Sequence, residues 1–313
     1  MSTFLGELHP SGGPAARHAM IDKMREENYS VDELCEAFEV SRSGYYAARK
    51  RPPSQRAKEN EIIVSKMKEI HSDRHLKAYG SPRMTTELQE EHGLACSENR
   101  VARLMANNDL KARHKASFRP KTTVQDGTQK ASPNILANTE KLSAPGQICV
   151  SDITYVATRE GWLYLAVVID LYSRAVVGWS IAESMHTFLV SSALAKSMTN
   201  LPPGSRPLFH SDRGCQYTSK EFRKLLKLYG LPQSMSAKGY GYDNAVNESF
   251  FASLKRESFP EDCCFETKAE ARRTIFDYLE VFYHKRRRHS SLGNVSPETF
   301  LNQHFQTQKT HLS

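Results

Sequence analysis

The 313-residue chain has an ordinary globular composition and an excess of positive charge. Hydrophobic residues make up 39% and charged residues 25%, which excludes a chain disordered throughout and leaves room for two or three domains with a sizeable core. The 43 Lys and Arg residues against 35 Asp and Glu give a formal net charge of +8. This balance favours a polyanionic partner, with nucleic acid as the leading candidate.

The sequence carries no signal for a membrane or for an oxidising compartment. No apolar run approaches the roughly 20 residues that span a bilayer, and the N-terminus MSTFLGELHPSGGPAARH lacks the apolar core of a signal peptide. We therefore expect a cytoplasmic protein. Its six cysteines include no CxxC pair, which predicts reduced thiols. His71 and His75 have a zinc-compatible spacing, but no paired cysteines follow them.

The first part of the chain contains a short helical unit behind a Gly, Pro and Ser-rich start. Residues 1–16 are predicted to be disordered. Over 17–52, Ser30 and Glu33 form a capping box for one helix, and Ser41 can cap a second helix that stops before a Pro-Pro pair. Two short helices around a tight turn indicate a helix-turn-helix, and a plain helical hairpin with a solvated basic end fits the pattern equally well.

Residues 53–117 repeat this arrangement as a second helical DNA-binding domain. After a charged helix at 55–72, Ser81 is expected to be the N-cap of a helix with Pro82 at its first position, and Ser97 to cap a further helix. Basic residues lie on or just after that last helix, as phosphate contact would require, although a solvated basic face is the alternative. They are Arg100, Arg103, Lys111, Arg113, His114 and Lys115.

A polar linker at 118–137 leads into a region with a different pattern, placed at 138–304 and followed by a tail at 305–313. The segments QICVSDITYVAT, GWLYLAVVIDLYS and RAVVGWSIAES are rich in Val, Ile, Tyr and Trp and are broken by short turns, which predicts three consecutive strands. Helices and strands then alternate, so the region is predicted to be α/β. The later elements are a helix at 187–200, a strand in RPLFHSDRG, a helix at 219–229 and a strand at 231–236.

Two aspartates of this region occupy positions where a carboxylate needs a physical reason. Asp152 lies within the first strand among residues expected to be buried, and Asp212 lies where the fourth strand ends before Gly214. An unpaired buried carboxylate is costly, and sites tend to form at strand ends in open α/β sheets. Two neighbouring aspartates repel one another unless a cation lies between them, and Mg²⁺ or Mn²⁺ prefers such oxygen ligands.

A third acid, Glu248, is expected on a helix capped by Asp243 or Asn244. Lys255 follows it by seven residues, which is close to two full helical turns, so both side chains face the same way. A metal-binding carboxylate followed by a cation suits a helix that holds metal and then grips phosphate. An amphipathic surface helix with a chance Glu and Lys is the alternative.

Other residues near these acids are weaker candidates. Asp170, at the end of the second strand, competes for a metal-ligand role, but a strand-terminal aspartate more often accepts hydrogen bonds from a turn. Glu160, Glu183 and Glu257 are expected at the surface. The segment SAKGYGYDN, which includes Lys238, is expected to form a flexible loop beside the site.

Four stretches carry a family resemblance: SDITYVATREGWLYLAVVIDLYSRAVVGWS, HSDRGCQYTS, SMSAKGYGYDNAVNESFFASLKRE and FYHKRRRHSSLGNVSPETF. They resemble the integrase-type catalytic domain of bacterial insertion-sequence transposases, specifically the OrfB product of insertion-sequence family three. The resemblance covers about 138–300, and the helical segments over about 20–115 are similar to the same proteins. Thirty-five residues separate Asp212 from Glu248, as in the Asp-Asp-Glu pattern of that family.

The resemblance implies the fold of ribonuclease H, a mixed five-stranded sheet with helices on both faces. It maps the catalytic and metal-binding acids to Asp152, Asp212 and Glu248, with two Mg²⁺ or Mn²⁺ ions, and the family's basic residue to Lys255. It implies a transposase that cuts and joins double-stranded DNA at insertion-sequence ends by phosphoryl transfer. Cys215 departs from the small or polar residue more usual at its position and leaves these ligands intact.

The expected DNA contacts divide by role, because phosphate contacts position a duplex whereas base contacts read it. A solvated cap on the helix that begins near Lys268 is the alternative for the basic run at 285–288. The expected phosphate contacts are Lys255, Lys238, Arg213 and this run, including Arg286 and Arg287. The expected base contacts are Arg42, Tyr45, Asn99, Arg100 and Arg103.

The resemblance also implies partners. We expect a homo-oligomer assembled on DNA in the bacterial cytoplasm, associated with the nucleoid and without membrane contact. An upstream OrfA protein is a candidate partner or fused segment. Two other functions stay open from the residues: a nuclease of the same fold that hydrolyses without strand transfer, and a DNA-binding regulator of transposition.

Overall fold

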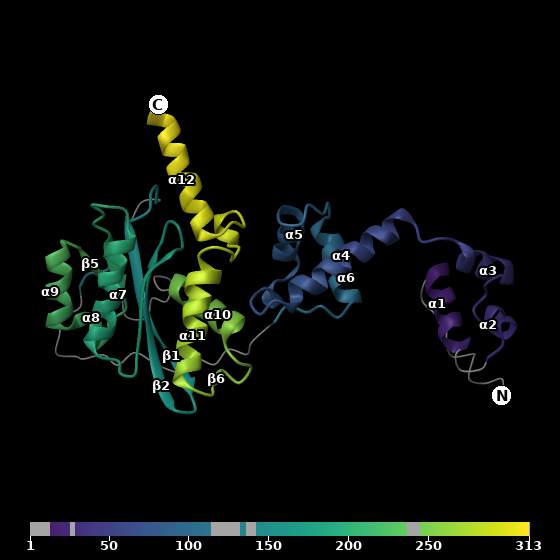
Figure 1. Cartoon of the computed structure of the whole chain (residues 1–313), viewed down its shortest axis with the longest axis horizontal. Helices are drawn as coiled ribbons and strands as arrows, with labels where there is room; N and C mark the ends of the chain where they lie inside the picture. The colour runs from purple at the N-terminus through teal and green to yellow at the C-terminus, as the bar shows by residue number, and fades with distance from the viewer. Residues whose placement is uncertain (1–12, 26–28, 114–131, 136–141, 237–244, 313) are drawn as a thin grey trace. The chain divides into compact units, whose positions relative to one another are not determined.

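The chain folds into two compact units that divide between Ile63 and Val64 (Figure 1). The computed structural model describes residues 13–25, 29–113, 132–135, 142–236 and 245–312. Every helix within these ranges is too short or too polar to span a bilayer.

The described part of the first unit contains α1 (Pro14–Arg25), α2 (Val31–Ala37) and α3 (Arg42–Lys50). The predicted capping box starts α2, since the Ser30 hydroxyl accepts from the Glu33 N–H and the Glu33 carboxylate accepts from the Ser30 N–H. Ser41 caps α3 as predicted by accepting from the Gly44 N–H at 3.1 Å. The sequence pattern does not predict α1, which contributes Ile21 to the apolar core shared with α2.

A second helical pair, α5 (Ser81–Glu90) and α6 (Glu98–Asn107), follows the long helix α4 (Gln55–Ser72) and a 3₁₀ turn, η1 (Leu76–Ala78). Buried Met84 and Leu88 of α5 and Val101 of α6 supply apolar surface to this pair. Ser97 caps α6 as predicted, because its hydroxyl accepts from the Arg100 N–H. The predicted cap of α5 is wrong by one residue: Gly80, with an extended backbone, precedes the helix.

A mixed sheet forms the centre of the second unit. Its described strands are β1 (Ile148–Thr158), β2 (Gly161–Asp170), β3 (Val176–Ala182), β4 (Leu208–Ser211), β5 (Gln233–Met235) and β6 (Cys264–Phe265). Their order is β3-β2-β1-β4-β5. Strand β2 pairs antiparallel with both β1 and β3, and β4 pairs parallel with both β1 and β5. Strand β6 pairs with the last two residues of β1. The sequence predicts the first five strands and misses β6, which is too short to show a period.

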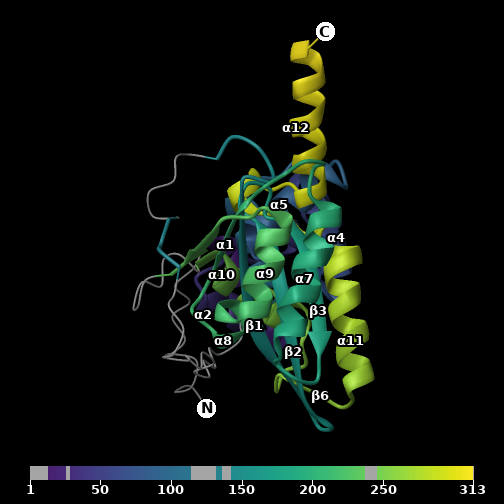
Figure 2. The same ribbon diagram turned by 90° about the vertical axis from the view of Figure 1, so that its left-hand side faces the viewer.

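Helices cover both faces of this sheet (Figures 1 and 2). One face carries α7 (Thr187–Asn200), α8 (Cys215–Thr218) and α9 (Lys220–Tyr229), and the other carries α10 (Ala245–Ser258) and α11 (Lys268–Phe276). Helix α11 continues into a π-helical segment, η4 (Asp277–Tyr283). After a short 3₁₀ turn, η5 (Ser290–Leu292), the last helix, α12 (Pro297–Leu312), projects beyond the sheet (Figure 2).

The close fit of α7 on the sheet depends on a glycine in β3. A Cβ atom at Gly178 would lie only 2.1 Å from the Ala193 carbonyl oxygen, so a larger residue would push the helix away. Buried Val168 of β2, Leu194 of α7 and Phe222 of α9 belong to the core on this face. The predicted fold class is therefore confirmed: an α/β mixed sheet between helices, preceded by helical segments.

Candidate active site

The parallel pairing of β1 with β4 brings two aspartates side by side. Ser151 of β1 is in register with Ser211 of β4, so Asp152 and Asp212 follow on neighbouring strands at the same level. The chain turns there into α8, and the Asp212 Oδ1 atom accepts from the Gly214 N–H at 2.9 Å. Both aspartates are half-buried. The sheet itself therefore sets the spacing of these two carboxylates.

A buried tyrosine of α8, Tyr217, is affected electrostatically by both aspartates. Its hydroxyl lies 2.9 Å from the Ser151 hydroxyl. Burial raises the pKa of Tyr217 well above its ordinary value, and the negative charges of Asp152 and Asp212 raise it further. One phenol therefore lies within electrostatic reach of both carboxylates, in agreement with the strand register. Because it stays neutral, it adds no third negative charge to the pair.

Glu248 lies in the first turn of α10, a helix that packs against β1. Its side chain is exposed, and that of Lys255, two turns later, is half-buried. The segment 237–244, with Lys238 and the predicted caps of α10, lies outside the described residues. Three apolar side chains of α10 are buried, as expected for a helix resting on a sheet: Phe250, Phe251 and Leu254.

Among the described residues, no three His, Cys, Asp or Glu side chains are grouped so as to hold a metal ion. The structure places Asp152 and Asp212 side by side, but Glu248 does not join them in a group of three. The oxygen atoms of all three are nevertheless the ligand type that hard divalent cations prefer.

Asp170 is a structural residue, which agrees with the turn role that the sequence favours for it. It is 1% exposed. Its Oδ1 atom accepts from the Gly146 N–H at 2.9 Å, and its Oδ2 atom accepts from the N–H and the hydroxyl of Ser173 at 2.9 and 2.6 Å. These bonds hold the turn between β2 and β3 and occupy the carboxylate, which removes Asp170 as a metal-ligand candidate.

Models of known domain families match the regions that carry these residues. An integrase core domain matches 143–240, and a further integrase core domain model matches 248–305. An HTH-like domain matches 58–118. The integrase matches include β1, β4 and α10, the elements that carry the three candidate acids.

Curated relatives match nearly the whole chain. Transposase InsF for insertion sequence IS3A, from Escherichia coli (strain K12), is 38% identical over 288 residues, 91% of this chain and 98% of the relative. An uncharacterized 31 kDa protein of insertion element IS600, from Shigella sonnei, is 40% identical over 273 residues, 87% of this chain and 99% of the relative. The chain belongs to the IS3 family of insertion-sequence transposases.

The transposase is therefore an enzyme that cuts and joins DNA strands. A further relative, the transposase for insertion sequence element IS904 of Lactococcus lactis subsp. lactis (strain IL1403), is 38% identical over 250 residues, 80% of this chain and 97% of the relative. A solved structure of the HTLV-2 integrase catalytic core domain in complex with magnesium (trimeric form) covers 50% of the transposase and 96% of its own chain, at 16% identity and a TM-score of 0.37.

Arg287 of the transposase is not a surface phosphate contact, which corrects the sequence prediction. Its side chain is 3% exposed and donates from Nε and Nη2 to the Glu257 carboxylate at 2.6 and 2.8 Å. Glu257, predicted at the surface, is fully buried. A run of arginines looks solvated in a sequence, but a carboxylate thirty residues earlier neutralises this one inside the protein. Sequence spacing gives no signal for that pairing.

Tyr45 of the transposase is not available to read DNA bases, which corrects a second prediction. It is fully buried in the core of the first unit, and its hydroxyl donates to the Asp22 carboxylate at 2.6 Å. Arg42, on the same helix, is exposed and pairs with Asp32 at 2.8 Å. The neighbouring Tyr46, at 42% exposure, is the tyrosine that faces outward.

Other predicted contacts are at least partly accessible. On α6, Arg103 is exposed and Arg100 is half-buried. Arg213, directly after Asp212, is half-buried and donates from Nε to the Ser236 carbonyl at 2.8 Å. That bond ties the end of β4 to the end of β5 and holds a guanidinium group beside the aspartate pair.

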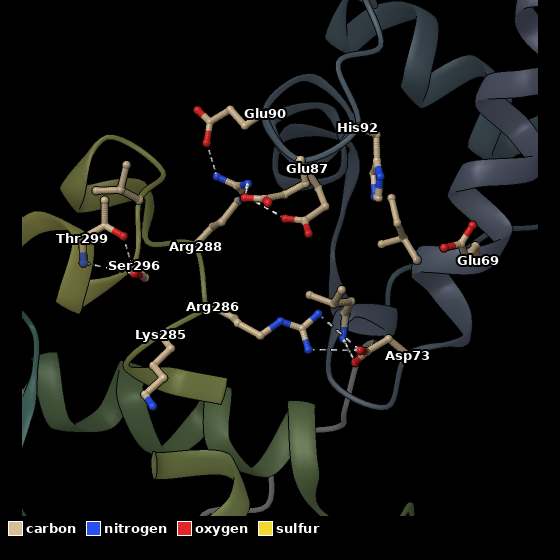
Figure 3. Close-up of a pocket in the computed structure, with 14 residues that line it drawn as sticks. Glu69, Asp73, Glu87, Glu90, His92, Lys285, Arg286, Arg288, Ser296 and Thr299 are labelled. Carbon is tan, nitrogen blue, oxygen red and sulfur yellow. Dashed lines mark hydrogen bonds and ion pairs between the residues drawn. The ribbon is translucent and has the colours of Figure 1, made fainter. Parts of the chain in front are cut away.

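A cavity of about 560 Å³ lies between α4, α5 and the loop after η4 (Figure 3). The helices line it with acids and the loop with bases. Arg286, which is exposed, pairs with Asp73 at 3.5 Å. Arg288, 6% exposed, donates to Glu87 at 2.7 Å and to Glu91 at 3.0 Å, so neither the predicted phosphate contact nor the solvated alternative holds for this residue. Asp152, Asp212 and Glu248 do not line this cavity. It lies between the HTH-like domain and the integrase core, and charged side chains from both line it.

Proposed function

We propose that Asp152, Asp212 and Glu248 are the catalytic acids of the transposase and hold two Mg²⁺ or Mn²⁺ ions. The observation that carries this proposal is the strand register, which sets the two aspartates side by side where β4 ends. Glu248 lies on a helix that packs against β1, the strand of Asp152. The donor set consists of carboxylate oxygen atoms, which fits hard divalent cations.

The protein's own backbone orients the two aspartates. The N–H groups of Ile153 and Gly214 donate to the Asp152 and Asp212 carboxylates at 2.7 and 2.9 Å. When bound, divalent ions would activate the attacking hydroxyl and stabilise the departing 3′ oxygen. Because phosphoryl transfer needs no covalent bond to the enzyme, the same carboxylates can serve hydrolysis by water and joining by a 3′ hydroxyl.

We assign the DNA contacts by charge and, for those residues that the structure describes, also by accessibility. Arg103 is exposed on α6, the second helix of the α5–α6 pair within the HTH-like domain, and in helix-turn-helix domains the second helix of the pair enters the major groove. Lys255 faces the same way as Glu248 along α10, which suits a phosphate next to the reacting one. The proposed phosphate contacts are Lys255, Lys238, Arg213 and Arg286, and the proposed base contacts are Arg42, Arg100 and Arg103.

We infer that the transposase works as a homo-oligomer on DNA at the nucleoid, with an OrfA protein as an additional partner. Joining one end of an element to another place requires two DNA sites to be held together, which a multimer achieves by repeating one binding surface. Light scattering of the transposase with and without a duplex carrying an element end measures this stoichiometry. A monomer on each duplex under cleavage conditions would contradict the inference.

The catalytic assignment is tested by replacing Glu248 with Gln in the full chain. The substrate is DNA carrying the element's own ends, with Mg²⁺ or with EDTA, and both strand cleavage and 3′-end joining are measured. Glu248→Gln is expected to bind this DNA like the wild type and to lose both reactions, because an amide is a poorer ligand for a hard cation than a carboxylate. Wild-type turnover by this variant would refute the assignment.

A matched control for this variant is Glu221→Gln. Glu221 is an exposed glutamate in the first turn of α9, just as Glu248 is an exposed glutamate in the first turn of α10. The same chemical change at an equivalent helix position therefore measures any general effect of losing a negative charge near a helix N-terminus. This control is expected to keep both reactions.

A further inference from the structure

The C-terminal half of α10 is held by a buried charged network. Glu257 lies nine residues after Glu248 and has no exposed surface. Its carboxylate accepts two hydrogen bonds from Arg287 and one from the Tyr278 hydroxyl, the latter at 2.8 Å. Burial by itself would raise the pKa of Glu257, but the Arg287 guanidinium and the Tyr278 hydroxyl lower it to about 2. The helix that carries Glu248 is thus anchored at its opposite end.

The HTH-like domain supplies a further member of this network. Arg83 of α5 pairs with the Glu257 carboxylate at 3.5 Å, and its side chain is 21% exposed. Its guanidinium carbon lies 5.6 Å from the centre of the Tyr79 ring, which holds the arginine in place. A charge on the HTH-like domain therefore reaches the buried acid of the catalytic helix.

The same domain also contacts the backbone at the end of α10. The last carbonyl groups of a helix have no partner within the helix and need one from elsewhere. His75 Nδ1 lies 3.2 Å from the Glu257 carbonyl oxygen, and Arg113 donates to the Phe259 carbonyl oxygen at 2.9 Å. Two side chains of the HTH-like domain thus complete the C-terminal end of the catalytic helix.

We propose that the HTH-like domain positions this helix: by holding the C-terminal end of α10, it sets where Glu248 stands relative to the aspartate pair. The positioning residues are Arg83, His75 and Arg113. A helix of 14 residues is a rigid rod about 21 Å long, so a shift at one end moves the other. Displacement of a catalytic group by about 1 Å costs on the order of a hundredfold in rate. The inference rests on the proposed role of Glu248.

The test uses Arg83→Gln and Arg113→Gln in the full chain. Arg83 is preferred to the buried pair because Glu257 keeps its bonds from Arg287 and Tyr278 when Arg83 is removed, so the fold is not left with an unpaired buried charge. Cleavage of element-end DNA is expected to slow about tenfold or more, and the Mg²⁺ concentration for half-maximal rate to rise several-fold. DNA-end binding by Arg83→Gln, and the midpoint of thermal unfolding of both variants, are expected to stay at wild-type values.

Two further variants sharpen this test. Arg83→Lys keeps a positive charge beside Glu257 and is expected to recover part of the lost rate. Arg272→Gln is the matched control, because Arg272 also donates to a backbone carbonyl, that of Ile181 at 3.1 Å, and also pairs with an acid, Glu183. It lies on α11 and is expected to leave the Mg²⁺ dependence unchanged.

Wild-type rates and Mg²⁺ dependence in Arg83→Gln and Arg113→Gln would overturn the proposal. A loss of rate that follows the unfolded fraction, with unchanged Mg²⁺ dependence, would overturn it as well, because a purely structural contact gives that result. The two proposals fail separately. Activity in Glu248→Gln removes the catalytic assignment, whereas an inactive Glu248→Gln beside a wild-type Arg83→Gln removes only the positioning role.

Discussion

The aspartate pair, with Asp152 on β1 and Asp212 just after β4, and the buried Glu257 near the end of α10 show two ways of keeping carboxylates partly or wholly out of water. Asp152 and Asp212 are half-buried side by side. Glu257 is fully buried, with three hydrogen bonds to its carboxylate from Arg287 and Tyr278. The first arrangement concentrates negative charge where solvent and a cation can reach it, and the second neutralises the charge within the fold.

This difference shows that a strongly shifted pKa does not by itself identify a catalytic acid. The carboxyl whose pKa is lowered to about 2 is that of Glu257, which belongs to the packing of α10 rather than to the strand ends. Structural ion-pair networks perturb pKa values as strongly as catalytic sites do. Strand register and accessibility, not the size of a pKa shift, distinguish the aspartate pair from Glu257.

The largest expected effect is on the reaction proposed at the aspartate pair. Asp152→Asn should lower the rate of end cleavage by about a thousandfold or more, since Asp152 is a proposed metal ligand and the loss of such a ligand removes several kcal/mol of transition-state stabilisation. Its free energy of unfolding should change by less than about 1 kcal/mol, because an asparagine oxygen can still accept from the Ile153 N–H. Single-turnover cleavage and urea unfolding measure the two quantities.

The control for this variant is Asp262→Asn. Asp262 is an exposed aspartate that accepts from a nearby backbone N–H, that of Cys264 at 3.1 Å. It therefore resembles Asp152 in its local bonding but lies in the turn before β6. Cleavage by Asp152→Asn within tenfold of this control would show that the Asp152–Asp212 pair is structural, and the contrast with Glu257 would disappear.

The next effect concerns stability at the helix end. Glu257→Ala should lower the free energy of unfolding by about 3–5 kcal/mol, because it leaves the Arg287 guanidinium buried without its partner. The double variant Glu257→Leu with Arg287→Met removes both charges and should recover most of that loss. Urea unfolding of the three proteins measures the difference. A single variant within 1 kcal/mol of wild type would contradict a structural role for Glu257.

The smallest expected effect is a pH dependence of stability from the same network. Burial, reinforced by the Arg287 and Arg83 guanidinium groups, lowers the pKa of His289 from 6.5 to about 3. The unfolded chain therefore takes up this proton at higher pH than the folded one does, and stability falls as pH drops from about 6.5 towards 3. Glu257, with its lowered pKa, adds a further loss between about 4.5 and 2.

His289→Gln isolates the first of these contributions. Arg287 Nη1 lies 3.0 Å from His289 Nε2, and a glutamine oxygen offers an acceptor without titrating. Thermal unfolding between pH 7 and pH 4 should depend less on pH in this variant than in wild type. Equal slopes for the two proteins would show that the pKa of His289 is the same in the folded and unfolded states, so that this residue contributes nothing to the pH dependence.

The sequence anticipated the elements whose signals are local. Ser30 with Glu33, Ser41 and Ser97 begin helices as predicted, because a cap needs only residues three positions apart. The α/β class followed from strand composition and turns. The placement of Asp152 beside Asp212 agrees with their positions in predicted neighbouring strands, whereas the convergence of Glu248 with them stays a prediction.

The sequence interpretation failed where a residue's environment comes from distant parts of the chain. Tyr45 resembles an accessible aromatic residue on a basic helix, yet Ile21 and Leu34 belong with it to one core. Arg287 stands in a run of bases, yet Glu257 and Tyr278 enclose it. A two-residue strand such as β6 has too few positions to show alternation, so only its pairing with β1 reveals it.

By itself the sequence determined the α/β class, most helix starts and, through resemblance, the transposase family, and it singled out the carboxylates that are proposed to hold metal. Only the tertiary structure decided which charges face solvent and which are neutralised inside, and that the HTH-like domain caps the C-terminal end of α10. The physical reason is range: periodicity and capping act over a few residues, whereas burial of a charge is decided by partners brought together by the whole fold.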